Sequence, residues 1–384
     1  MPLPLERVTI YPAWNRRDMK VCMLSGQAKF SGGLENVVDS LSQFLVNHNA
    51  VVDIFGRSSQ DFVESYSNCK IIGVRPYSLF PHGIGIPHYG KFEYNLKTWR
   101  KTKTYGPYDI IHGHGDNCFF SSLFRDKTPF LMTFHGTMAK VLEDSSDMRN
   151  RPFLYAEKVA AARCDIAVAC SAAVKNELVQ YYGISSKKIK IIHNGINVEK
   201  FVPIDKKEAR RKLLLPEHNT YALWVGSNPY RKRLSIAVKA VENSKCSKLL
   251  IIGMNGGQNS GKTVYLGKIS EQDLITAYSA ADVLVFPTIY EGFPMVPMEA
   301  LSCGLPAIVS EQSNLGEIIT EGTHGFVVKN KNALAYQEKI DQIINDAAML
   351  REMSNNCRVL ALDYSWQNQA EKYWLIYQRL LKNR

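Results

Sequence analysis

Short apolar segments alternate with amphipathic segments along almost the whole chain. In its first half, runs rich in Val, Ile, Leu and Phe occupy residues 21–24, 51–55, 70–74, 109–112, 130–134, 165–169 and 189–192. Most of these runs are continuously apolar, as expected for strands that are covered on both faces. Between two of them, apolar residues recur at the spacing of one helix face, namely Leu34, Val37, Val38, Leu41 and Leu45. Repeated strand–helix–strand units predict an open parallel sheet of the doubly wound type.

The same pattern restarts in the second half. Residues 198–212 are polar and basic and contain Pro203, which is typical of a linker that runs into a helix. Further apolar runs follow at residues 221–225, 249–252, 264–266, 283–286, 307–309 and 326–328. The chain ends in a helical pattern whose apolar stripe consists of Trp366, Ala370, Tyr373, Trp374, Tyr377 and Leu381.

These patterns predict an α/β protein with two Rossmann-like domains. We place the N-terminal domain at residues 1–200, the C-terminal domain at residues 201–365 and a C-terminal helix at residues 366–384. A length of 384 residues agrees with two domains of roughly 150 residues or slightly more. Residues 1–18 precede the first strand without a usable period, and are either an ordered extension or a segment ahead of a natural start at Met19.

The composition is that of a globular protein, with 45% hydrophobic and 22% charged residues. No apolar stretch approaches the ~20 residues of a membrane-spanning helix. Charged residues such as Glu6 and Arg7 interrupt any signal-peptide core, so we expect a cytoplasmic protein. The eight cysteines are scattered without a C-x-x-C pair, which favours reduced packing cysteines over zinc ligands or disulfides.

The net charge of +11, from 47 Lys and Arg against 36 Asp and Glu, is compatible with three partners: nucleic acid, an anionic membrane surface or a phosphorylated small molecule. Basic clusters lie at residues 97–103 and 206–212. No recognition-helix, RNP or zinc-finger pattern accompanies them, so we expect no nucleic-acid partner. Peripheral contact with anionic lipid headgroups is the better hypothesis, and simple solvation of two helix faces is its alternative.

A glycine pair, Gly32 and Gly33, follows the first predicted strand and leads directly into a helix. Paired glycines allow close approach of a ligand, and the N-terminus of a helix presents free N–H groups to an anion. A turn that merely needs positive φ is the alternative interpretation.

Two glutamates eight residues apart, Glu291 and Glu299, follow the predicted strand at residues 283–286. The segment between them contains Gly292 and two prolines, so Glu291 is expected at the carboxyl edge of the sheet and Glu299 on the next helix. Ligands of doubly wound sheets bind at this edge. A carboxylate there can accept hydrogen bonds from sugar hydroxyls, although two solvated glutamates would show the same spacing.

Together these segments resemble the retaining family 4 glycosyltransferases of GT-B fold. The similarity covers about residues 19–384 and is most specific in the E-x7-E stretch from Glu291 to Glu299 and the segments that flank it. Weaker similarity lies in the glycine pair, in the turn at His135 and at residues 194–196. Membership of this family implies two Rossmann-like domains that face each other across a cleft, with the C-terminal helix crossing back to the first domain.

The resemblance also implies a nucleotide-sugar donor, and a sugar, glycan or lipid-linked acceptor, in cell-envelope or glycan biosynthesis. By position, His135, Lys232 and Glu291 would be the catalytic residues. Glu291 would contact hydroxyls of the donor sugar, Glu299 the ribose, and His135 would lie near the transferred sugar. The donor would be bound by Gly32, Gly33, Arg231, Gly292, Phe293, Pro294, Met295, Val296 and Glu299.

One position departs from the family pattern. A Gly-Arg pair followed five residues later by Lys usually neutralises the leaving diphosphate, but here Ser227 stands at the arginine position. Lys232 occupies the lysine position, and Arg231 could supply the second charge. The chain contains no D-x-D, so we expect no metal and no cofactor, and protein cations in their place.

Two further motifs suggest other chemistry. Gly256, Gly261, Lys262 and Thr263 match the phosphate-binding pattern G-x4-G-K-T, but a strand rather than a helix is predicted directly after them. A P-loop nucleotidase is therefore an alternative function, as is a sugar-nucleotide epimerase or phosphorylase of the same fold. The His112-Gly113-His114 segment is interpreted as a loop at a strand end facing the cleft rather than as a metal site.

Overall fold

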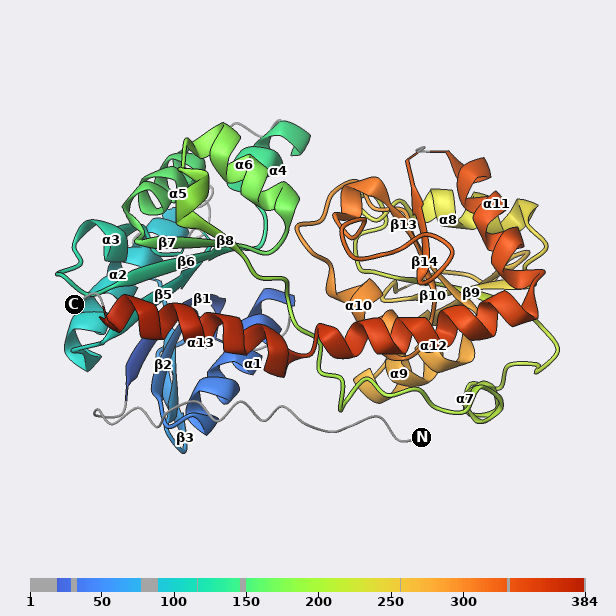
Figure 1. Cartoon of the computed structure of the whole chain (residues 1–384), viewed down its shortest axis with the longest axis horizontal. Coiled ribbons are helices and arrows are strands. Elements are labelled where there is room, and N and C mark those ends of the chain that lie inside the picture. Colours follow the sequence, from blue (N-terminus) through green and yellow to red (C-terminus); the bar gives the residue numbers. More distant parts are fainter. Residues whose placement is uncertain are drawn as a thin grey trace.

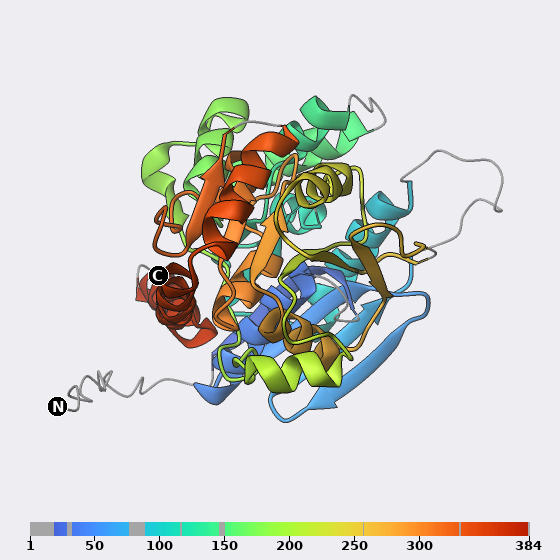
Figure 2. The same cartoon turned by 90° about the vertical axis from the view of Figure 1, so that its right-hand side faces the viewer.

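Two β-sheets organise the chain, and helices flank each of them (Figure 1). The structure is a computed structural model that describes residues 19–28, 33–76, 89–115, 117–145, 150–255, 257–329 and 332–382. We call the first sheet with its helices the first lobe, and the second sheet with its helices the second lobe. The lobes lie side by side along the long axis, and the view of Figure 2 along that axis has the second lobe in front.

The first sheet has the strand order β3-β4-β2-β1-β5-β6-β7-β8. Its strands are β1 (Lys20–Gln27), β2 (Val51–Arg57), β3 (Phe62–Tyr66), β4 (Cys69–Val74), β5 (Ile110–His114), β6 (Phe130–Phe134), β7 (Ile166–Ala169) and β8 (Ile189–Ile191). The first-lobe helices are α1 (Gly33–Asn47), α2 (Tyr89–Tyr105), α3 (Phe119–Leu123), α4 (Met138–Ser145), α5 (Arg151–Arg163), α6 (Ala172–Tyr182) and the 3-10 turn η2 (Ser186–Lys188).

The second sheet is parallel throughout, in the order β11-β10-β9-β12-β13-β14. Its strands are β9 (Tyr221–Val225), β10 (Lys248–Ile252), β11 (Thr263–Gly267), β12 (Val283–Phe286), β13 (Ala307–Ser310) and β14 (Gly325–Val328). Its helices are α7 (Lys206–Lys212), α8 (Leu234–Asn243), α9 (Glu271–Ala280), α10 (Met295–Ser302), α11 (Ala333–Ile344), α12 (Ala347–Asp363) and the 3-10 turn η3 (Glu311–Ser313). The last helix, α13 (Trp366–Lys382), packs on the first lobe.

Each apolar run that predicted a strand forms one, and most of these strands are buried on both faces. In β9, which is buried at every position, Leu223 packs in one core with α9 and α10, while Ala222 and Trp224 pack in another with α8 and α11. Strand β3 was not predicted from the sequence. It lies at the sheet edge, antiparallel to β4, and its residues are partly or fully exposed. A solvated edge strand has no continuous apolar run by which the sequence could show it.

The chain passes between the lobes twice, and the two passages are hydrogen-bonded to each other. The N–H of Ile196 donates to Tyr364 (2.9 Å) and the N–H of Trp366 donates to Ile196 (3.0 Å). Gly195 is required here, because a Cβ at this position would lie 2.6 Å from Cδ2 of Trp366. After this crossing, α13 returns to the first lobe, where Tyr373 and Tyr377 are buried in one core with β1 and β2 (Figure 1).

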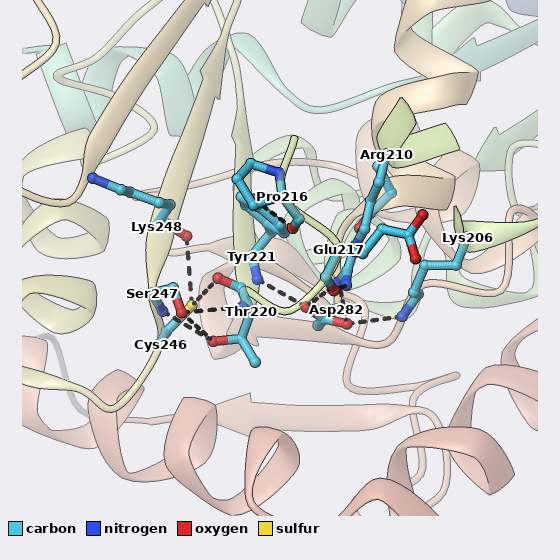
Figure 3. A network of polar contacts seen from close by, with 11 residues as sticks. Lys206, Arg210, Pro216, Glu217, Thr220, Tyr221, Cys246, Ser247, Lys248 and Asp282 are labelled. Atoms are coloured by element: carbon cyan, nitrogen blue, oxygen red, sulfur yellow. Dashed lines mark hydrogen bonds and ion pairs between the residues drawn. The ribbon is translucent and has the colours of Figure 1, made fainter. Parts of the chain in front are cut away.

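The basic cluster at residues 206–212 is largely occupied by structural contacts. Arg210 forms two hydrogen bonds to the carboxylate of Asp282 (2.8 and 3.0 Å), and Lys206 forms a third (2.8 Å), as Figure 3 shows. The same carboxylate accepts from the N–H of Tyr221 (2.8 Å). The network fixes α7 to the starts of β9 and β12. Much of the positive charge that the sequence shows here is therefore neutralised within the fold.

The cluster at residues 97–103 is similar. Lys97 and Lys101 both pair with Asp61 (2.8 and 3.4 Å), and Lys103 lies 3.9 Å from Asp126. Within the ranges that the structure describes, no helix has the length and apolar character needed to span a membrane.

Candidate active site

Residues from both lobes meet where the loop after β12 contacts the turn after β6. A Cβ on Gly292 would lie 2.6 Å from the carbonyl carbon of His135 and closer still to its oxygen. Gly136, with φ +148°, packs against Tyr290, whose hydroxyl donates to Glu177 of the first lobe (3.0 Å). Glycine is thus required at residue 292 for steric reasons. The contact places Glu291 and His135 at the same interface.

Glu291 and two cations form the polar centre of this interface in the second lobe. Oε1 of Glu291 lies 3.3 Å from Nη2 of Arg231 and 3.8 Å from Nζ of Lys232. The side chains of Glu291 and Lys232 are each only 13% exposed, whereas Arg231 is 51% exposed. Desolvation lowers the pKa of Lys232, and the nearby charge of Glu291 opposes that decrease.

The turn between β9 and α8 positions the two cations. The carbonyl of Arg231 accepts from the N–H of Ile289 (2.8 Å), which ties this turn to the loop that contains Glu291. Trp224 Nε1 donates to the carbonyl of Lys232 (3.0 Å). A Cβ on Gly226 would lie 2.5 Å from Cδ of Lys232, so glycine leaves the space through which the lysine side chain runs. Its ammonium lies 4.6 Å from the ring centroid of Phe286.

Glu299 lies on α10 and accepts a hydrogen bond from the hydroxyl of Tyr278 on α9 (2.8 Å). Desolvation raises the pKa of Glu299, while the hydrogen bond from Tyr278 and the charge of Lys232 lower it. Because both Glu291 and Glu299 act on the pKa of Lys232, the structure brings the two glutamates of the E-x7-E stretch to one lysine.

The loop that contains Glu291 leads directly into helix α10. Helix α10 begins at Met295, and the residue before it, Pro294, makes no side-chain cap hydrogen bond. The preceding residue, Phe293, is buried, and its carbonyl accepts from Asn194 of the first lobe (3.0 Å). The uncapped N–H groups of Met295 and Val296 form the kind of helix N-terminus that attracts an anion.

His135 lies at the end of β6 in the first lobe. Its Nε2 is 3.1 Å from Nδ1 of His114, and the two rings are stacked. Desolvation lowers the pKa of His135 to about 4, so the imidazole is neutral near pH 7. Gly33 is the first residue of α1, directly after β1 and the undescribed segment that contains Gly32.

The structure corrects the interpretation of His112-Gly113-His114 as a loop. These residues end strand β5, and both imidazoles are fully buried. The sequence does not indicate the partners of His112, because Thr133, Tyr373 and Tyr377 approach it from distant parts of the chain. Within the described part of the chain, no three His, Cys, Asp or Glu side chains are grouped as a metal site.

The motif that suggested a P-loop has another role in the fold. Nζ of Lys262 donates to the carbonyls of Ser244 (2.6 Å) and Val241 (3.3 Å) at the end of α8, which is a helix C-terminal cap. Thr263 opens strand β11 rather than a helix, while Gly256 lies outside the described residues. Lys262 is therefore engaged with α8, and the structure does not favour the P-loop nucleotidase.

Comparisons with known proteins define the class. Residues 31–200 match the family described as glycosyltransferase family 4, and residues 205–359 match glycosyl transferases group 1. The chain belongs to this glycosyltransferase family, and its two lobes form the GT-B fold.

Individual proteins are similar over nearly their full length. An uncharacterized glycosyltransferase of Methanocaldococcus jannaschii is 25% identical over 94% of this chain and 98% of its own. A D-inositol 3-phosphate glycosyltransferase of Streptomyces bingchenggensis is 23% identical over 96% and 90%. Sucrose-phosphate synthase of Thermosynechococcus elongatus superposes with a TM-score of 0.83 at 23% identity, over 95% of this chain and 100% of its own. Anabaena HepE with UDP-glucose gives a TM-score of 0.73 at 16% identity, over 94% and 100%.

Proposed function

We propose that this glycosyltransferase moves a hexose-type sugar from a nucleotide-diphosphate-sugar to an acceptor, with retention of configuration and without a metal ion. The observation that supports this most is the pair of cations, Lys232 and Arg231, beside Glu291 and the uncapped N-terminus of α10. Solved relatives support the donor class, since structures of HepE contain UDP or UDP-glucose and that of a starch synthase from Arabidopsis thaliana contains ADP.

Lys232 and Arg231 would stabilise the leaving diphosphate. Cleavage of the sugar–phosphate bond concentrates negative charge on the diphosphate, and preorganised cations stabilise that charge more in the transition state than before it. Lys232 suits the task because its ammonium is largely withdrawn from water and already held by surrounding groups. The N–H groups of Met295 and Val296 would bind the same diphosphate or the sugar.

The remaining residues would orient the donor. Glu291 would exchange its cation contacts for hydroxyls of the transferred sugar, and Glu299, held by Tyr278, would accept from the ribose. Neutral His135 would lie beside the sugar from the other lobe, and Gly33 would approach the donor at the start of α1. Family membership supports retention, through acceptor attack on the same face from which the diphosphate departs.

A donor screen tests the proposal. We expect a nucleoside diphosphate, from a panel of UDP, GDP and ADP, to raise the melting temperature, because a ligand that binds only the folded state stabilises it. The matching sugar nucleotide should then release its diphosphate in the presence of acceptor, and excess EDTA should leave this rate unchanged. Loss of activity in EDTA with recovery in Mg²⁺ would refute metal independence. ATP hydrolysis without sugar transfer would indicate the nucleotidase, and an altered sugar still attached to its nucleotide would indicate the epimerase.

A further inference from the structure

Three histidines form a buried series that leads from the core of the first lobe to the interface between lobes. His112 and His114 lie two residues apart on β5 and therefore on one face, with ring centroids 4.3 Å apart. His114 is opposite Thr133 in the register with β6, and His135 lies two residues beyond Thr133. The sheet thus aligns the three rings, with His135 nearest the proposed sugar site.

The inner end of the series is anchored by the returning helix α13. The hydroxyl of Tyr377 lies 2.6 Å from Nδ1 of His112, and Oγ1 of Thr133 lies 2.8 Å from its Nε2. His112 therefore has hydrogen-bond partners at both ring nitrogens. Tyr377 is fully buried, so this end of the series lies in the core of the first lobe.

The outer end differs, because each of its histidines has one nitrogen in use. Nδ1 of His114 and Nε2 of His135 share one hydrogen bond (3.1 Å), whereas Nδ1 of His135 is buried and has no hydrogen bond within the described chain. Two neutral imidazoles can share such a bond only if one donates and the other accepts. The bond therefore also determines which nitrogen of His135 carries its proton.

Asn194 lies beside His135 at the interface between lobes. Its Nδ2 donates to the carbonyl of Phe293 (3.0 Å), which connects the first lobe to the loop that contains Glu291. Desolvation lowers the pKa of His135 more than the proximity of Asn194 raises it. His114 is therefore the partner that occupies a ring nitrogen of His135.

We propose that His114 is a positioning residue: the hydrogen bond between its Nδ1 and Nε2 of His135 keeps His135 in one tautomer and holds its ring in the orientation that the transferred sugar meets. The inference deepens the proposed function and depends on it for the contact between His135 and the sugar. The tautomer itself is independent of that function, which allows the two to be tested separately.

The test combines kinetics with ¹⁵N NMR of labelled histidine. We expect His114→Leu to lower kcat about ten- to a hundredfold, because a misplaced catalytic group costs rate more than nucleotide affinity. Affinity for the bare nucleoside diphosphate should stay within about twofold. His114→Asn, whose amide group can replace Nδ1 as either donor or acceptor, should restore most of the rate. The matched control is Tyr377→Phe, which removes a buried hydrogen bond from the inner end and should lower the melting temperature with little change in kcat.

The NMR spectra provide the readout that a merely structural role would not change. The parent should show His135 as a single neutral tautomer, and His114→Leu should show a mixture. An unchanged His135 tautomer in His114→Leu, or equal loss of kcat in Tyr377→Phe, would overturn the proposal. If the leucine variant does not fold, His114→Gln, which moves the amide by one methylene, takes its place with the same expectation. A clean tautomer change in an enzyme that transfers no sugar would refute the function and leave the positioning intact.

Discussion

Replacing Gly292 by alanine tests whether the contact between lobes positions the reacting groups. Gly292 is not among the glycines with positive φ, so alanine introduces no backbone strain and acts only through its Cβ. That atom would lie 2.6 Å from the carbonyl carbon of His135, against at least 3.4 Å in ordinary contacts. His135 and Glu291 would have to separate by roughly 1 Å, and a displacement of this size can cost on the order of a hundredfold in rate.

The assay compares kcat/KM for sugar transfer with the affinity for the bare nucleoside diphosphate. We expect Gly292→Ala to lower kcat/KM about a hundredfold and to change the nucleotide affinity little, because most of the proposed nucleotide contacts lie in the second lobe. Gly316→Ala is the matched control, since a Cβ there would meet Val327 at 3.6 Å, an ordinary contact. Transfer by Gly292→Ala at half the parental rate or more would show that this contact is not needed in the reacting state.

Two further predictions concern the glutamates and acidity. Glu291→Gln should chiefly lower kcat, whereas Glu299→Gln should also weaken binding of the bare nucleotide. If only Glu291→Gln loses nucleotide affinity, the proposed sugar contact of Glu291 and ribose contact of Glu299 are reversed. Burial lowers the pKa of His112 from 6.5 to about 3. On acidification, His112 is therefore protonated near pH 6.5 in the unfolded chain but only near pH 3 in the folded chain. The free energy of unfolding should therefore fall as the pH falls below 6.5, and His112 alone should account for about 2 kcal/mol of this loss at pH 5. Urea unfolding at pH 7.5 and 5.0 measures the loss, which should be smaller in His112→Asn than in the parent.

Much of the fold could be predicted, because parallel strands buried on both faces give continuous apolar runs. Strand β3 could not, since its exposed edge is half polar. The same physics misled the interpretation of His112 and His114, which end a buried strand although polar residues usually mark loops. Their partner Tyr377 is 265 residues from His112, and no local pattern reveals such a contact.

The sequence indicated the residues of the candidate site but not their arrangement. Spacing placed Glu291 at a strand end and Glu299 on a helix, yet the shared lysine depends on the turn between β9 and α8. Gly226 and Gly292 were visible in the sequence, but their steric roles depend on Lys232 and His135, which approach them from other segments. The sequence likewise overstated the free positive charge of the two basic clusters, because Asp61 and Asp282 pair with their cations from distant positions in the chain.

The central claim is that Lys232 stabilises the leaving diphosphate of a nucleotide-sugar, and one comparison tests it directly. Lys232→Ala and Lys262→Ala remove the same group from two lysines of the second lobe, of which the second caps α8. A charge-assisted contact to phosphate is worth roughly 1.5–3 kcal/mol, so losing it should cost about ten- to several-hundredfold in rate. We predict that diphosphate release from the donor falls by this amount in Lys232→Ala and stays within a few-fold of the parent in Lys262→Ala. The opposite ranking, with ATP hydrolysis lost in Lys262→Ala, would contradict the account.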